Sequence, residues 1–285
     1  MLLFSALIAA AFSIGKLAAP LIDPAALTAV RFVCAAAVMG AVVLATRTQV
    51  MRAHAIAPWR YLVLGGLMGT YFVLMFEALK TAQPVATSAI FTLIPAMSAG
   101  FSWVLMRQTY PLLAKIALLI GAIGAVWVIF RADLDALIAF DLGKGETIFF
   151  FGCVAHALYT PMVPRLNRGE PVLVFALGTI LGALVVVGMY ATPAIIATDW
   201  AALPGIVWFT VAYLGIFTTA GTFALLQFAA LRLPSGKVMA YGYLTPVFVA
   251  LYEGMLGNGW PAPFVWIGVG LIVCALLILL MGRDE

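Results

Sequence analysis

The sequence predicts an all-helical integral membrane protein in which ten transmembrane helices form two inverted repeats of five. Three observations lead to this prediction. The chain of 285 residues is 65% hydrophobic and only 9% charged, whereas soluble domains carry roughly 25% charged residues. Its apolar runs are long enough to cross a bilayer as helices, and they lack the polar and apolar alternation of barrel strands. Finally, a long segment of the chain occurs twice.

The repeated segment runs from Gly69 to Pro111 and again from Gly221 to Pro261. The first copy opens Gly-Thr-Tyr and the second Gly-Thr-Phe, at an offset of 152 residues (69 to 221). With two short deletions, Pro95 of the first copy corresponds to Pro246 of the second. A repeat of this length predicts two copies of one module, with a site where the copies meet.

The first half of the chain contains five apolar runs of spanning length, bounded by prolines or charged turns: Leu2–Ala19, Ala25–Ala45, Trp59–Leu79, Val85–Met106 and Leu112–Phe130. Pro20 and Pro24 separate the first two runs. A basic loop precedes the third run, the turn at Lys80 follows it, and Pro111 opens the fifth. Each run therefore ends where a helix is expected to end.

The second half contains five more runs, again bounded by polar or proline-rich turns: Thr147–Pro164, Val172–Ala191, Leu203–Leu231, Ser235–Leu256 and Ala262–Met281. The run that starts at Leu203 exceeds a spanning length, so we expect a helix broken or overlong at its start. The most polar segment of the chain lies between the halves. We therefore divide the chain into a first repeat (residues 1–131), an outside linker (132–146) and a second repeat (147–285).

The distribution of lysine and arginine predicts that both termini are cytoplasmic, because short cytoplasmic loops carry the basic excess. The expected inner ends hold ten basic residues: Arg47, Arg52, Arg60, Arg107, Lys115, Arg165, Arg168, Arg232, Lys237 and Arg283. The expected outer ends hold five: Lys16, Arg31, Lys80, Arg131 and Lys144. An odd number of helices in each repeat then inverts the second repeat relative to the first.

Motifs of catalysis and of cofactor binding are missing from the sequence. It contains no His-Glu-x-x-His, no Gly-x-Ser-x-Gly and no P-loop, and its three cysteines have no metal-ligand spacing. The net charge of +4 is typical of a topology signal, not of a nucleic-acid surface. We therefore expect no enzyme activity, no cofactor, no metal and no nucleic-acid partner.

Carboxylates within the predicted helices are candidates for function, because a charge at the bilayer centre costs about 2.5–3.5 kcal/mol on insertion scales. Glu77 and Glu253 can couple protons or bind an amine. Lys80 follows Glu77 by three residues, on the same helix face, which favours a structural ion pair there. Glu253 has no basic neighbour in the sequence, so function and structure are equally good explanations for it.

Two basic residues, Lys16 and Arg31, lie near the expected outer ends of the first two helices. They can bind a substrate carboxylate. They can equally snorkel to the interface or pair with Glu77 or Asp23. The sequence leaves these explanations open and slightly favours a structural one for Arg31.

Polar and aromatic side chains within the helices are candidates to line a cavity. His156, one turn from Tyr159, either faces a polar cavity or forms a hydrogen bond in the packed interior. The aromatic candidates for an apolar or aromatic solute are Tyr71, Trp103, Tyr159, Tyr241 and Tyr243, and packing or the lipid interface is the alternative for each. Pro95 and Pro246 interrupt helix hydrogen bonding at matched positions, which predicts hinges.

The order and spacing of these residues resemble the EamA-type drug/metabolite transporter superfamily, and most closely its amino-acid exporter branch. The resemblance rests on landmarks spread over nearly the whole chain: Lys16, Pro24, Arg31-Phe32, Ala78-Leu79, Pro95, Pro111, Gly121, Gly124, and then Ala230-Leu231, Pro246, Pro261 and Gly268. It implies a central cavity between helices 1–4 and 6–9, alternating access, and export from a bacterial inner membrane. It also places Lys16 and Arg31 at recurrent basic positions.

One departure from the family pattern concerns energy coupling. Each repeat of the family commonly carries a glutamate about a dozen residues after its central proline. Here Arg107-Gln108 and Asn258-Gly259 occupy those places, and Glu253 comes too early. A facilitator is therefore as plausible as a proton antiporter.

These observations predict a monomeric exporter of small metabolites, with amino acids as the expected substrates. A cavity with few fixed charges suits zwitterions with apolar side chains better than phosphates. Lipophilic drugs, cations and nucleobases are the alternative substrates. A membrane-embedded enzyme or a scaffold without transport is the alternative of another class.

Overall fold

The computed structural model describes residues 2–130, 132–138 and 142–281. All regular elements in these ranges are helices, and seven helical stretches are long and apolar enough to cross a membrane. The prediction of an all-helical membrane protein is confirmed at this level, and the arrangement of ten helices in two inverted repeats stays a prediction. Arg131 and Arg283, which contributed to the predicted orientation, lie outside the described residues.

Most helices begin and end within a few residues of the positions that the sequence predicts, although the helix that begins at Val172 continues six residues past the predicted end at Ala191 (191 to 197). They are α1 (Leu2–Ala18), α2 (Pro24–Ala45), α3 (Trp59–Leu79), α6 (Leu112–Ile129), α8 (Lys144–Leu166), α9 (Val172–Ala197) and α14 (Val265–Met281). The Asp23 side chain caps α2 by accepting hydrogen bonds from the backbone N–H groups of Ala25 and Ala26. Two short helices were not predicted, η1 (Arg52–Ala55) and α7 (Leu134–Ile138).

Two runs that the sequence predicts as continuous helices are broken. Val85–Met106 is divided into α4 (Pro84–Phe91) and α5 (Ile94–Met106). Ser235–Leu256 is divided into α12 (Ser235–Ala240), η3 (Tyr241–Leu244) and α13 (Thr245–Met255). Each break directly precedes Pro95 or Pro246, because a proline lacks the N–H of the helix ladder and crowds the preceding turn.

The long eighth run is also broken, but in its middle and not at its predicted start. It consists of α10 (Gly205–Tyr213), the π-helix η2 (Leu214–Gly221) and α11 (Thr222–Ala230). Within η2, the hydroxyl of Thr219 donates to the carbonyl of Leu214, five residues earlier. Hydrophobic periodicity cannot reveal such a segment because it is apolar in the same way as an α-helix.

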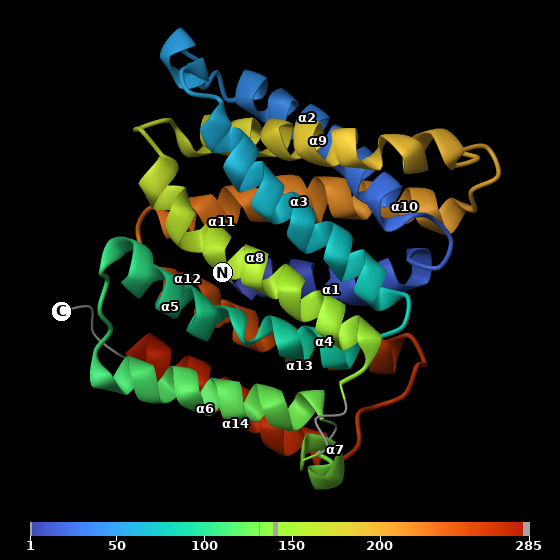
Figure 1. The fold of residues 1–285 in the computed structure, drawn as a ribbon, viewed down its shortest axis with the longest axis vertical. Helices are drawn as coiled ribbons and strands as arrows, with labels where there is room; N and C mark the ends of the chain where they lie inside the picture. Colours follow the sequence, from blue (N-terminus) through green and yellow to red (C-terminus); the bar gives the residue numbers. More distant parts are fainter. Residues whose placement is uncertain (1, 131, 139–141, 282–285) are drawn as a thin grey trace.

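The helices form a bundle with a central group and two edges. Figure 1 shows α6 and α14 side by side along one edge, and α2 and α9 along the opposite edge. The helices α1, α3, α4, α8, α11 and α13 lie between these pairs.

Glycines allow two pairs of helices to approach closely. A side chain on Gly65 of α3 would overlap the backbone of Ala183 in α9. A Cβ on Gly124 of α6 would lie 2.7 Å from the carbonyl oxygen of Gly268 in α14. Small residues at such crossings are typical of membrane helix packing.

Candidate functional site

Two opposite ends of the bundle carry different polar structures. We call the end at which α1 and α3 finish the Lys16 end. The opposite end, at which α3 begins and α8 finishes, is the Arg60 end.

A cavity of about 620 Å³ lies at the Lys16 end, within the usual size range of small-molecule sites, about 300–1,000 Å³. Lys16 and Glu253 both line this cavity, together with Asn258. Its other walls are largely apolar, with Leu17, Val85, Trp260 and Val265 among the lining residues. The structure thus brings together a basic and an acidic residue that lie far apart in the sequence.

Lys16 is positioned by the end of α3. Its Nζ donates hydrogen bonds of 2.8 Å to the carbonyl oxygen of Leu79 and 2.9 Å to that of Ala82. These carbonyls lie where α3 ends and its backbone oxygens lack helical partners, a place that favours a cation. An ammonium has three donors, so one donor of Lys16 remains for a ligand.

Glu253 is buried, with 7% of its surface exposed. Its Oε2 accepts a hydrogen bond of 3.0 Å from Nδ2 of Asn258. Neither Glu253 nor Lys16 forms an ion pair with any described residue. Each charge is therefore held by neutral groups and can interact with a charged ligand in the cavity.

Four aromatic rings form a layer one turn deeper than Lys16. Phe12 of α1, Tyr71 of α3, Phe91 of α4 and Phe149 of α8 are all buried. Phe12 lies 6.0 Å from Phe91 and 5.6 Å from Phe149, and Tyr71 lies 6.2 Å from Phe91 and 5.8 Å from Phe149, between ring centroids. We call these four rings the aromatic layer. Phe12 precedes Lys16 by one turn on the same helix face, so the layer lies deeper in the bundle than Lys16.

His156 packs against the aromatic layer, with ring centroids 4.6 Å from Tyr71 and 5.6 Å from Phe91. It lines a small internal cavity of about 20 Å³ together with Tyr71 and residues of α1, α3, η2 and α11. A space of this size holds about one water molecule. The Nδ1 of His156 has no hydrogen-bond partner among the described residues.

Tyr159, one turn after His156 in α8, belongs to a second group of buried polar residues. Nε2 of Gln227 donates to the hydroxyl of Tyr159 at 2.9 Å and to that of Thr179 at 3.0 Å. All three residues are buried. The sequence analysis identified Tyr159 as a candidate but not Gln227, the residue of α11 that donates both of these hydrogen bonds.

The other predicted cavity residues lie elsewhere. Glu77 forms an ion pair of 2.8 Å with Lys80, and both side chains are partly exposed. This ion pair is the structural role that the spacing of the two residues favoured for Glu77. Trp103 is 62% exposed on α5. Tyr243 is buried against Gly121 of α6, and the backbone carbonyl of Tyr241 accepts a hydrogen bond from Ser5.

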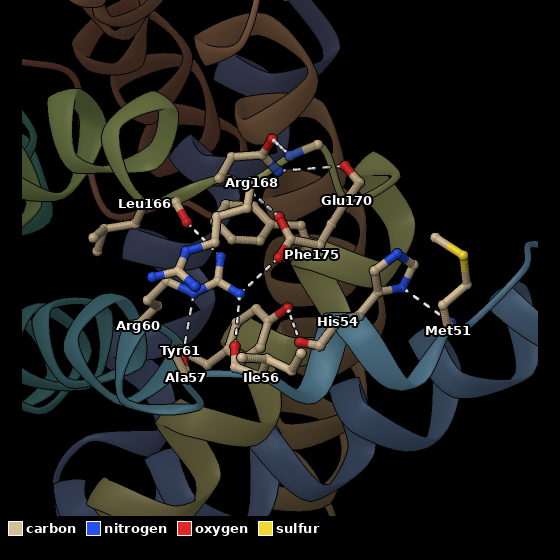
Figure 2. A network of polar contacts seen from close by, with 12 residues as sticks. Met51, His54, Ile56, Ala57, Arg60, Tyr61, Leu166, Arg168, Glu170 and Phe175 are labelled. Carbon is tan, nitrogen blue, oxygen red and sulfur yellow. Dashed lines mark hydrogen bonds and ion pairs between the residues drawn. The ribbon is translucent and has the colours of Figure 1, made fainter.

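A buried ion pair lies at the Arg60 end, as Figure 2 shows. Nη2 of Arg60 lies 2.7 Å from Oε1 of Glu170, and the two side chains are only 1% and 2% exposed. Nη1 of Arg60 donates to the carbonyl of Leu166 at 2.6 Å, and the backbone N–H of Arg168 donates to Oε2 of Glu170 at 2.6 Å. The start of α3 is thereby joined to the loop between α8 and α9.

The same network extends into the segment that precedes α3. Arg60 also donates to the carbonyls of Ile56 and Ala57, and the hydroxyl of Tyr61 donates to the carbonyl of His54 at 2.9 Å (Figure 2). Burial by itself raises the pKa of Glu170, but the hydrogen bonds from Arg60 and Arg168 outweigh it and hold the pKa below its ordinary value. Glu170 is therefore a carboxylate at neutral pH.

Comparison with known proteins identifies the family. The model of the EamA-like transporter family matches residues 1–130 and 143–281. The chain belongs to the EamA-like transporter family. This confirms the family resemblance seen in the sequence, while the amino-acid exporter branch stays a prediction.

One curated protein and one solved structure are similar to the chain over most of its length. It is 25% identical over 282 residues to the uncharacterized transporter YyaM of Bacillus subtilis (strain 168), covering 96% of this chain and 90% of the relative. A protein of solved crystal structure superposes with a TM-score of 0.74 at 22% identity, covering 97% of this chain and 94% of the other. The first similarity concerns a transporter, and the second shows the fold.

Proposed function

We propose that this protein exports small zwitterionic solutes, amino acids foremost, across a bacterial inner membrane by alternating access. Membership of the EamA-like family supports transport. The observation that supports this substrate class is the cavity at the Lys16 end, where one cation and one carboxylate face the same space. A zwitterion satisfies both charges at once.

The chemistry of the cavity fits an amino acid with an apolar side chain. The free donor of Lys16 suits the substrate carboxylate. Glu253 suits its ammonium group, since Asn258 occupies only Oε2. The apolar wall formed by Leu17, Val85 and Trp260 suits the side chain. A phosphate would instead call for several basic residues.

The proposed architecture has ten transmembrane helices. Seven of them are the long apolar stretches. The other three are α1, α14 and the broken segment α12–η3–α13. Residues 1–131 and 147–285 form two inverted repeats around the central cavity, and both termini lie in the cytoplasm. In this orientation the Lys16 end is outside and the Arg60 end inside, and the protein acts as a monomer.

Alternating access requires that the two ends open in turn. The aromatic layer closes the path from the Lys16 end, and the Arg60–Glu170 pair joins elements at the Arg60 end. With both in place, the space beside His156 is about 20 Å³, too small for an amino acid. We therefore assign this arrangement to a closed stage of the cycle.

Uptake into proteoliposomes by charge-removing variants tests the substrate class. We expect Lys16→Met and Glu253→Gln each to lower the uptake of labelled leucine, methionine and phenylalanine at least tenfold, because each removes one ionic partner of the zwitterion. Lys80→Met and Glu77→Gln are matched controls, because they remove the same charges from an exposed pair at the same end.

Equal uptake by the Lys16 or Glu253 variants and by their controls would contradict the proposed substrate class. The same assay with an imposed pH gradient tests coupling. If the gradient accelerates the wild type, Glu253→Gln should lose that acceleration and Glu77→Gln should keep it. An absence of amino-acid uptake by folded wild-type protein would favour lipophilic cations or nucleobases as substrates.

A further inference from the structure

A second basic residue, Arg31 of α2, lies in the interior of the bundle. Its exposed fraction is 0%, and it forms no ion pair with any described residue. A buried charge without a counterion is costly by several kcal/mol. Such a residue calls for an explanation beyond packing.

The structure excludes the structural explanations that the sequence left open for Arg31. Its full burial is incompatible with snorkelling to the interface. Oδ1 of Asp23 accepts hydrogen bonds from the backbone at the start of α2, and Glu77 pairs with Lys80. Both acidic residues named as possible partners are thus engaged elsewhere.

Neutral groups hold the Arg31 guanidinium in place. The hydroxyl of Thr219 accepts hydrogen bonds from Nε at 3.1 Å and from Nη2 at 2.6 Å. The ring of Phe72 covers the guanidinium, with 3.7 Å between Cζ and the ring centroid. Nη1 has no hydrogen-bond partner among the described residues. The side chain is thus oriented, and one of its strongest donors is unused.

The anchor of Arg31, Thr219, belongs to the π-helix η2, and π-helical segments occur frequently at functional sites. Thr218, which precedes Thr219, and Thr222, the first residue of α11, line the small internal cavity beside His156. Phe72 lines the same cavity and also contacts the guanidinium. A movement of this one ring would therefore connect Arg31 with the cavity.

We infer that Arg31 binds the carboxylate of the transported solute inside the bundle, at the stage when the central cavity is expanded. The carboxylate takes the place of the Phe72 ring and accepts a hydrogen bond from Nη1, while Thr219 keeps the guanidinium in position. This inference rests on the proposed function. It adds a second carboxylate site, deeper than Lys16, so that an outgoing solute passes from Arg31 to Lys16.

The preference of the protein for a solute with a carboxylate over one without it tests the proposed role of Arg31. Phenylalanine and phenylalaninamide differ in that the amide lacks the carboxylate charge. Each is added as a competitor of labelled leucine uptake, and each is tested for thermal stabilisation of the purified protein, which requires no transport. We expect the wild type to prefer phenylalanine, and Arg31→Gln to lose about ten- to a hundredfold of that preference, as removal of a charge-assisted hydrogen bond predicts.

Two further variants separate binding from structure. Arg31→Lys keeps the buried charge but loses the planar fork, so it should fold and show a reduced preference for phenylalanine even where Arg31→Gln fails to fold. Lys80→Gln removes an exposed basic residue and should keep the wild-type preference. If Arg31 were purely structural, its loss would weaken the inhibition of leucine uptake by both competitors equally and leave the preference for phenylalanine unchanged.

The outcomes distinguish the two proposals. An unchanged preference in folded Arg31→Gln and Arg31→Lys would overturn the role of Arg31 and leave the proposed function standing. A wild type that neither transports nor is stabilised by any amino acid would overturn both.

Discussion

The ion pair between Arg60 and Glu170 is almost fully buried at the Arg60 end, with side chains that are 1% and 2% exposed. Breaking a buried pair on one side leaves an uncompensated charge and costs about 3–5 kcal/mol, whereas apolar replacement of both partners is often neutral. We therefore expect Arg60→Met to lower the thermal stability in detergent strongly. The double variant Arg60→Met with Glu170→Met should recover most of the loss. Equal destabilisation by the single and double variants would contradict the assignment.

The pH dependence of stability offers an independent test of Glu170. Its pKa in the folded protein lies below its ordinary value, which is about 4.3 in an unfolded chain. The contribution of the carboxylate to stability is therefore complete above about pH 4.3 and is lost as the pH falls through the folded pKa. The difference in melting temperature between wild type and Glu170→Gln should shrink below about pH 4. A constant difference down to about pH 3 would be inconsistent with this pair.

Side-chain pairings within one helix could be predicted from the sequence, whereas pairings between helices could not. Glu77 and Lys80 share a face by their spacing, and the structure contains their ion pair. Arg60 and Glu170 are 110 positions apart, and only the fold reveals their contact. Trp103 and Tyr159 were predicted on equal grounds, yet one is exposed and the other buried. A membrane helix is apolar on every face, so its sequence does not show which face is inside.

At the level of elements, helix ends were predictable because prolines and charged turns mark them. Breaks inside helices were partly predictable. Pro95 and Pro246 signalled interruptions, but the sequence did not show that the helices would divide directly before them. The π-helix η2 left no signal, since its apolar and threonine residues suit an α-helix equally well. Only the fold shows this segment and the hydrogen bonds that its Thr219 accepts from Arg31.

The matched breaks lead to a prediction about movement. If Pro95 and Pro246 keep the two broken helices hinged, alanine at either position restores a continuous helix and slows transport, while protein abundance stays near normal. Pro193→Ala is the control, because Pro193 lies within α9 at the edge of the bundle. Unchanged uptake rates in Pro95→Ala and Pro246→Ala would remove the hinge interpretation.

At the scale of the whole molecule, the two copies of the sequence repeat share one structural feature. The two copies of the repeat give α4–α5 and α12–α13, and both are broken before the corresponding proline. The pair α6 and α14 forms one edge of the bundle. The cavity with Lys16 and Glu253 draws on both halves of the chain.

Closure at both ends is also a property of the whole molecule. The aromatic layer unites four helices at the Lys16 end, and the Arg60–Glu170 pair joins three segments at the other. A channel would need both ends open together, whereas a carrier needs one closed at all times. The proposed carrier therefore requires these two ends to open one at a time.

Counterflow of leucine in proteoliposomes tests this account most directly. Vesicles loaded with unlabelled leucine receive a trace of labelled leucine outside, without any ion gradient. A carrier with alternating access predicts a transient accumulation of label above equilibrium that unloaded vesicles do not show. Label that enters loaded and unloaded vesicles alike, or not at all with folded protein, would contradict the account.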